Sequence, residues 1–170
     1  MTDTETAANL VERLRGIPIF EHVTEDRLQA LVELMSTRQI AAGDVLVREG
    51  DVGDEMFVLL EGQVRISKTT LDQERYTVAV LDGAQTPFFG EMAMLDADRR
   101  SATIDAVRDS QLLALRRDDF EKFGNDHPEV GWVVVRALAR MVSEKLRHAN
   151  EDALLLFEAL VNEVRSKATG

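Results

Sequence analysis

The sequence predicts an α+β fold that is mainly β, in which a small antiparallel sandwich or barrel lies between helical segments at the two ends of the chain. Residues 38–116 consist of short β-rich runs separated by glycine-containing turn signals, the pattern of antiparallel strands. On either side of this region, apolar residues recur every three or four positions, as on one face of a helix. From residue 129 to about Val164 there is no proline and the only glycine is Gly131, which predicts a long helix.

Two helices are expected before the β-rich region. The first covers roughly residues 6–14 and is interrupted in "RGIPIF" by Gly16 and Pro18. Thr24 is expected to cap the second helix, because a threonine oxygen can accept a hydrogen bond from the free N–H groups of the first turn. Its apolar face comprises Leu28, Leu31, Val32 and Met35.

The strands are expected within "RQIAAGDVLVREGDVGDEMFVLLEGQVRISKTT", "YTVAVLDG", "SATIDAV" and "QLLALR". Turn signals divide these runs at close intervals, and one of them is the Gly-Gln pair at Gly62. The sequence therefore predicts several short strands, each ending at a turn.

Two further helices are expected after the strands. Asp118 and Glu121 resemble a capping box at the start of the first, and Gly124 suits the position after its end. Pro128 falls in the first turn of the second helix. At 1.5 Å per residue, this helix would be roughly 50 Å long, which exceeds the width of a small domain.

The apolar residues of the long helix mostly step by three and four. They are Val135, Val142, Leu146, Ala149, Ala153, Leu156 and Leu160. Such a seam suits packing against a partner helix and predicts a homodimer formed through this helix. A helix folded back over its own barrel is the alternative interpretation.

Composition excludes several classes of protein. The chain has 170 residues, no cysteine and a formal charge of −11, which excludes disulfides and thiolate metal sites and argues against non-specific binding to nucleic acid or to a membrane surface. Residues 130–170 contain six basic and five acidic side chains, so the first 129 residues hold 14 basic and 26 acidic ones. Without a signal peptide or a run of roughly 20 apolar residues, the protein is expected to be cytoplasmic.

The stretch "FFGEMAMLDADRRSATIDA", residues 88–106, contains the chemistry of a phosphate site. Gly90 lacks a Cβ atom and lets the backbone approach a ligand, and the following "EMAML" can form a helical turn with free N–H groups at its start. Arg100 and Ser101 can add a charged and a neutral donor. Glu91 can accept a hydrogen bond from a sugar hydroxyl, or hold Arg100 in an empty site. The alternative is a tight turn with a surface ion pair.

Metal sites and catalysis have little support in the sequence. His22, His127 and His148 lie in separate elements without ligand spacing. Asp96 and Asp98 could suggest a calcium loop, but a solvated acidic turn explains them as well. We expect neither a bound metal nor an enzyme, since no P-loop or dinucleotide fingerprint is present.

Residues 88–106 resemble the phosphate-binding cassette of cyclic nucleotide-binding domains, which occur in catabolite-activator-type regulators, cyclic-nucleotide-dependent kinases and gated channels. The residues that match the family pattern are Phe89, Gly90, Glu91, Met92, Ala93, Met94, Arg100, Ser101 and Ala102. A second family signature is matched upstream by "LVREGDVGDEMFVLLEG", which includes Gly50, Asp51, Gly53 and Gly62. The resemblance covers roughly Leu14 to Leu146.

This resemblance implies a jelly-roll-like, eight-stranded antiparallel barrel over residues 15–129, flanked by an N-terminal helical segment, residues 1–14, and by the long C-terminal helix, residues 130–170. A cyclic nucleotide would bind inside the barrel. The implied ligand is cAMP. The second choice is cGMP, because Ser101 stands in place of alanine and leaves both nucleotides possible.

The resemblance also implies a role for each site residue. Gly90 and Glu91 would face the ribose 2′-hydroxyl. Arg100 and Ser101 would hold the cyclic phosphate, aided by the amides of Ser101 and Ala102. The further binding positions are Met92 and Ala93 in the cassette and Ile66 near the base. Arg99 matches no binding position and is interpreted as part of a solvated loop.

Three departures from the family pattern bear on these implications. The segment "LDGAQTPFFGE" is slightly longer than usual and contains Pro87. Ala149 and Asn150 occupy the positions of a Thr-Ser pair that reads adenine in the catabolite-activator group; Asn150 can bind a purine edge, or it is simply an exposed helical asparagine. The chain stops at Gly170, so we expect no helix-turn-helix domain in it.

The sequence thus predicts a regulatory module that binds a cyclic nucleotide and signals through its C-terminal helix to an unknown downstream protein. A dimeric scaffold with a disused pocket is the first alternative. A truncated transcription regulator is the second.

Overall fold

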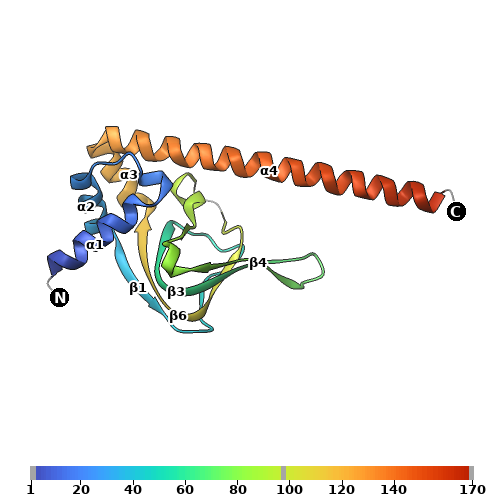
Figure 1. Cartoon of the computed structure of the whole chain (residues 1–170), viewed down its shortest axis with the longest axis horizontal. Helices are drawn as coiled ribbons and strands as arrows, with labels where there is room; N and C mark the ends of the chain where they lie inside the picture. The colour runs from blue at the N-terminus through green and yellow to red at the C-terminus, as the bar shows by residue number, and fades with distance from the viewer. Residues whose placement is uncertain (1–2, 97–98, 169–170) are drawn as a thin grey trace. The chain divides into compact units, whose positions relative to one another are not determined.

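The computed structural model describes residues 3–96 and 99–168. The chain divides into two compact units, residues 1–135 and residues 136–170, and each is described by itself. The first contains the sheet and most of the helices, and the second is the remainder of the last helix (Figure 1).

Two helices precede the sheet, as predicted, and a 3-10 turn lies in the break between them. These elements are α1 (Asp3–Arg15), the 3-10 turn η1 (Pro18–Phe20) and α2 (Glu25–Leu34). Thr24 occupies the N-cap position of α2, but its side chain makes no capping hydrogen bond to the backbone. The Thr24 side chain instead hydrogen-bonds to Asp26 and lowers the pKa of that carboxyl. The predicted position is therefore correct and the predicted bond is wrong.

Within the described residues, six antiparallel strands form one sheet. They are β1 (Ser36–Ile40), β2 (Val45–Val47), β3 (Glu55–Thr69), β4 (Arg75–Asp82), β5 (Phe88–Phe89) and β6 (Thr103–Arg116). The main path runs β1-β6-β3-β4, while β2 pairs with β6 and β5 pairs with β3. The two longest strands, β3 and β6, pair with each other in the middle of the sheet.

The expectation of a closed eight-stranded barrel is wrong, because the sheet is open and has six strands. The prediction that the fold is mainly β and antiparallel, with flanking helices, is confirmed. Gly62, expected to end a strand, lies inside β3 with a φ of 86°. There the β3–β6 register shifts, but pairing resumes on the other side. A bulge lets a strand bend without ending, so runs that the sequence separates form single long strands.

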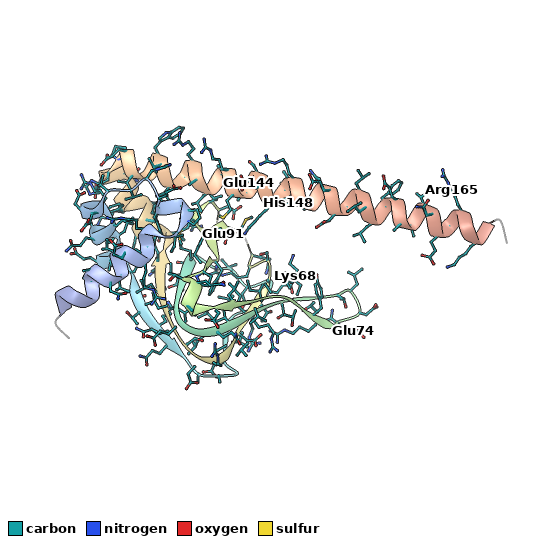
Figure 2. The ribbon with its side chains drawn as sticks, viewed as in Figure 1. Lys68, Glu74, Glu91, Glu144, His148 and Arg165 are labelled. Carbon is teal, nitrogen blue, oxygen red and sulfur yellow. The ribbon has the colours of Figure 1, made fainter. Side chains whose placement is uncertain are left out.

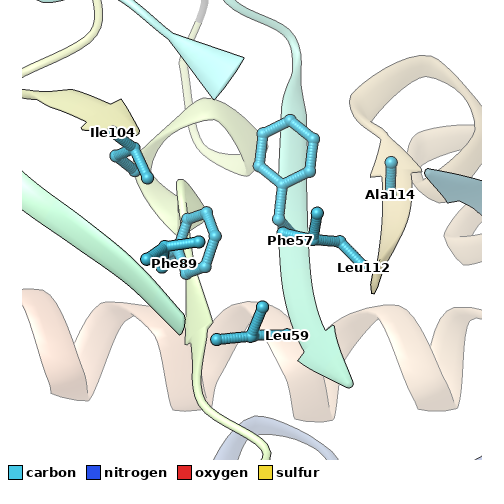
Figure 3. Close-up of a cluster of buried hydrophobic side chains, with 7 residues drawn as sticks. Phe57, Leu59, Phe89, Ile104, Leu112 and Ala114 are labelled. Carbon is cyan, nitrogen blue, oxygen red and sulfur yellow. The ribbon is translucent and has the colours of Figure 1, made fainter. Parts of the chain in front are cut away.

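The core of the sheet is a cluster of buried apolar side chains from three strands, β3, β5 and β6. Its buried members are Phe57, Leu59, Val64, Phe89, Ile104, Leu112 and Ala114 (Figure 3). The rings of Phe57 and Phe89 lie 5.7 Å apart, within the range of favourable aromatic pairs. Ile66 is only partly buried and packs against this cluster.

Two helices follow the sheet, α3 (Arg117–Asp126) and α4 (Pro128–Ala168). The expected capping box is wrong, because the N-cap of α3 is Arg116 and no side chain caps it. Gly124 was expected to follow this helix, but it lies within α3. It is close to α4, because a Cβ atom on Gly131 would lie 3.1 Å from the Gly124 Cα. These glycines allow the backbones of α3 and α4 to approach closely.

The second unit is a single α-helical segment, and the predicted long helix is confirmed: α4 has 41 residues in all. Every side chain from Ser143 to Leu160 is exposed. The large apolar side chains exposed in this unit are Leu146, Leu154, Leu155, Leu156, Phe157, Leu160 and Val164. In the part of the chain that the structure describes, no helix combines the length and the apolar character needed to cross a membrane.

Candidate functional site

The predicted helical turn after Gly90 is present as η3 (Glu91–Met94). Gly90 adopts left-handed backbone angles, φ 77° and ψ 13°, and its carbonyl accepts a hydrogen bond from the Ala93 amide. Glu91, shown on this turn in Figure 2, is 5% exposed. Ala93 is buried as well, whereas Met92 is exposed. The turn therefore directs a carboxylate inward beside a glycine.

The main chain of Arg100 is held by the loop that precedes β3. Its amide donates to the carbonyl of Asp51 at 2.7 Å, and its carbonyl accepts from the amide of Gly50 at 2.9 Å. Arg99 forms a β-bridge with Val52 and donates from Nη1 to the Gly50 carbonyl at 2.6 Å. Arg99 is exposed, as expected for a residue of a solvated loop, but its side chain also makes this hydrogen bond to the Gly50 backbone.

The side chain of Arg100 is half-buried against the start of β3. Nη1 donates to the backbone carbonyl of Glu55 at 2.7 Å, and Cζ lies 5.6 Å from the centre of the Phe57 ring. Burial lowers the pKa of Arg100, and the negative charges of Glu55 and Asp54 oppose this shift. Among the described residues, no salt bridge joins Arg100 to a carboxylate.

The structure brings some of the predicted site residues together. Gly90 and Arg100 are neighbours, because a Cβ atom on Gly90 would lie 3.0 Å from Arg100 Nη1. Ser101 is exposed and Ala102 half-buried where the chain leads from Arg100 into β6. Ile66 lies on β3 opposite Ile104 of β6. Asn150 is an exposed residue of α4 in the second unit, so its contact with a base stays a prediction.

No group of histidine, aspartate or glutamate side chains among residues 3–96 and 99–168 is arranged to hold a metal ion. The two aspartates of the calcium-loop interpretation cannot be compared, because Asp98 lies outside the described residues.

The match to a known family covers the residues just described. Residues 37–127 match the model of the cyclic nucleotide-binding domain. The chain belongs to the cyclic nucleotide-binding domain family. This confirms the family expected from the two signatures, and the matched segment includes the whole stretch from Gly90 to Ala102.

Relatives of this cyclic nucleotide-binding domain include regulators and channels. The chain is 32% identical over 152 residues to the cyclic AMP receptor protein of Thermus thermophilus, covering 89% of this chain and 68% of the relative. It is 35% identical over 115 residues to a cyclic nucleotide-gated potassium channel of Rhizobium etli, covering 68% of this chain and 30% of the channel.

Solved structures agree with this placement. The Thermus thermophilus catabolite activator protein superposes with a TM-score of 0.74 at 30% identity, over 82% of this chain and 63% of that one. The structure of PfPKA-R with cAMP bound gives a TM-score of 0.66 at 28% identity, over 72% of this chain and 43% of that one. The domain thus spans less than two thirds of both solved chains.

A second polar cluster of the domain was not expected from its sequence. Asp105 of β6 is 4% exposed and accepts hydrogen bonds from Arg65 Nη2 and Arg75 Nη2, both at 2.6 Å. Arg75 Nε also donates to the hydroxyl of buried Ser67 at 2.6 Å. The interaction with Asp105 raises the pKa of Arg65. These residues come from three strands, so no local pattern could have indicated the cluster.

Proposed function

We propose that this protein is a regulatory module that binds cAMP, with cGMP as a second ligand, and transmits occupancy through α4 to a partner protein. One observation carries the proposal: the half-buried guanidinium of Arg100 lies beside Gly90 without a carboxylate partner among the described residues. The Thermus relative is named a cyclic AMP receptor protein, and the PfPKA-R structure holds cAMP. Both names support cAMP as the ligand.

The chemistry of Arg100 favours a phosphodiester. Burial of a cation costs free energy unless an anion or hydrogen bonds offset the lost hydration, and the lowered pKa of Arg100 reports this cost. Arginine stays ionised at neutral pH. A cyclic phosphate carries one negative charge and offers two oxygens to the planar guanidinium. Ser101 and the amide of Ala102 would supply further donors.

The sugar would lie against the η3 turn. Glu91 is buried and its carboxylate can accept a hydrogen bond from the 2′-hydroxyl, while Gly90 presents no side chain to the ribose. In this proposal Met92 and Ala93 complete the cassette. Ile66 contacts the base from β3, and Asn150 contacts its edge.

Calorimetric titration with cAMP and with cGMP tests the proposal. We expect binding in the micromolar range or tighter for the wild-type protein. Arg100→Ala should weaken it by about a hundredfold or more, because a charge-assisted, bidentate contact is lost. Arg99→Ala is the matched control and should leave the affinity within about threefold. If folded protein gives no heat of binding with either nucleotide, the proposal is wrong.

The exposed apolar residues of α4 favour a role in association. Within the proposal, two copies pair through this helix and nucleotide binding changes how they pair, which requires different affinities for two arrangements. The same residues also favour the second candidate, a scaffold that dimerises without ligand. Sedimentation measured with and without saturating cAMP separates the two, because only the regulatory module would respond.

A further inference from the structure

The guanidinium of Arg100 occupies a space that exists only because residue 53 is glycine. A Cβ atom on Gly53 would lie 2.0 Å from Arg100 Nε, 2.4 Å from Cζ and 2.6 Å from Nη2. Real Cβ atoms do not approach other heavy atoms this closely. Any other residue at position 53 must therefore displace the guanidinium or shift the backbone.

Glycine at this position is not explained by backbone conformation. Gly43, Gly50, Gly62 and Gly90 have positive φ angles, and Gly53 does not. Its backbone is accessible to alanine, so the requirement for glycine is space alone. The three atoms nearest to such a Cβ all belong to the end of the flexible Arg100 side chain. We therefore expect an added methyl group to move Arg100 and to leave the backbone in place.

Three alternate positions of one segment hold the guanidinium. Gly53 leaves room beneath it, the carbonyl of Glu55 accepts its hydrogen bond at 2.7 Å, and the ring of Phe57 lies 5.6 Å from Cζ. All three contacts come from one short segment of the chain, which lies against the guanidinium. The hydrogen bond to the Glu55 carbonyl and the cation–π contact with Phe57 hold the guanidinium of Arg100 beside Gly90.

We propose that Gly53 is a positioning residue for the phosphate of the bound nucleotide and that it acts entirely through Arg100. This inference rests on the proposed function. By leaving the space open, Gly53 places the guanidinium beside the η3 turn before the ligand arrives, so that little reorganisation is needed on binding. It links the upstream glycine signature to the phosphate cassette as one site.

The first test is Gly53→Ala, titrated with cAMP by NMR, which reaches millimolar dissociation constants. We expect binding to weaken about ten- to a hundredfold, which corresponds to a lost or misplaced charge-assisted contact. Gly16→Ala is the control. A Cβ atom there lies no closer than 3.4 Å to its nearest neighbour, the Arg13 carbonyl oxygen, and φ is not left-handed. Its affinity should match that of the wild-type protein.

A double-mutant cycle separates positioning from a general structural role. In the Arg100→Ala background, adding Gly53→Ala should change the affinity for cAMP by no more than about twofold, because the group that Gly53 positions is absent. An equal loss in both backgrounds would overturn the inference. So would a loss of folding in Gly53→Ala, seen as a collapse of its thermal transition.

A measurement on the free protein keeps this inference distinct from the proposed function. The Nε–H resonance of Arg100 reports its place near the Phe57 ring, and it should shift in Gly53→Ala and stay unchanged in Gly16→Ala. If the wild-type protein binds neither nucleotide, the proposed function fails and the phosphate role of Gly53 fails with it. If it binds cAMP but the resonance does not move in Gly53→Ala, the positioning role alone is overturned.

Discussion

Asp105 and Glu91 are both buried carboxylates, but their surroundings differ. Asp105 lies between two arginines, each 44% exposed, and it joins β6 to the β3–β4 hairpin. Glu91 lies on the short η3 turn inside the segment that matches the family. The first arrangement is suited to stability and the second to binding. A buried charge that loses its partners is costly, so these residues should respond differently to mutation.

Asp105→Ala is expected to destabilise the protein by about 2 kcal/mol, less than for a fully buried pair because its two arginines are partly hydrated. Urea denaturation measures the change in the free energy of unfolding. The control is Glu163→Ala, which removes an exposed pair with Lys167 at 2.7 Å and should cost about 0.5 kcal/mol or less. Equal effects of the two substitutions would contradict this prediction.

At the scale of elements, β3 and β6 decide the architecture. Gly62 permits the bulge through which β3 continues, because its φ is 86° and a Cβ atom would lie 2.3 Å from the Asp109 carbonyl oxygen and from Ser110 Oγ. Ser110 Oγ in turn accepts a hydrogen bond from the Gln63 amide at 3.0 Å. The bend therefore depends on contacts between two strands.

Gly62→Ala should destabilise the protein by about 2–4 kcal/mol, since both the left-handed backbone and the close contact with β6 oppose a side chain. Thermal and urea unfolding give the measurement, and Gly16→Ala serves as the control. A Gly62→Ala protein as stable as the wild type would show that the bulge tolerates a side chain and that the architecture does not depend on this glycine.

At the scale of the whole molecule, the charge distribution limits how a ligand can be attracted. The chain has a net charge of −11, and charges farther away than about 8 Å are screened at physiological ionic strength. A monoanionic nucleotide must therefore be held by local donors such as Arg100. The acidic excess lies in the first 129 residues, whereas residues 130–170 carry six basic and five acidic side chains, so the predicted pairing of two copies through apolar contacts along α4 is not opposed by the charge of this helix.

Leu156→Glu should weaken self-association by about tenfold or more, because it places a charge in the predicted seam at a cost above about 1.4 kcal/mol. Leu155→Glu is the matched control. Leu155 and Leu156 are 64% and 72% exposed, but consecutive helical residues point about 100° apart, so Leu155 lies off the seam. Analytical ultracentrifugation measures both. A monomeric wild-type protein, or equal losses in the two variants, would contradict the predicted seam.

The sequence alone determined the features that depend on residues close together in the chain. Helical periodicity indicated the N-terminal helices and α4, and the two short motifs identified the family and predicted that Gly90, Glu91 and Arg100 belong to one site. These signals are local, because a turn or a helical face is encoded within a few residues.

Only the tertiary structure decided how separate segments meet. The strand β3 continues past Gly62 because Glu61 and Gln63, on the two sides of this bulge, both pair with β6, and the Gln63 amide donates to Ser110 Oγ, 47 positions away. The guanidinium of Arg100 contacts Gly53 and Glu55, which are more than forty positions away in the chain, and the buried Asp105 joins three strands. Contacts of this kind depend on register and on side-chain packing between strands, and neither is encoded in any one stretch of sequence.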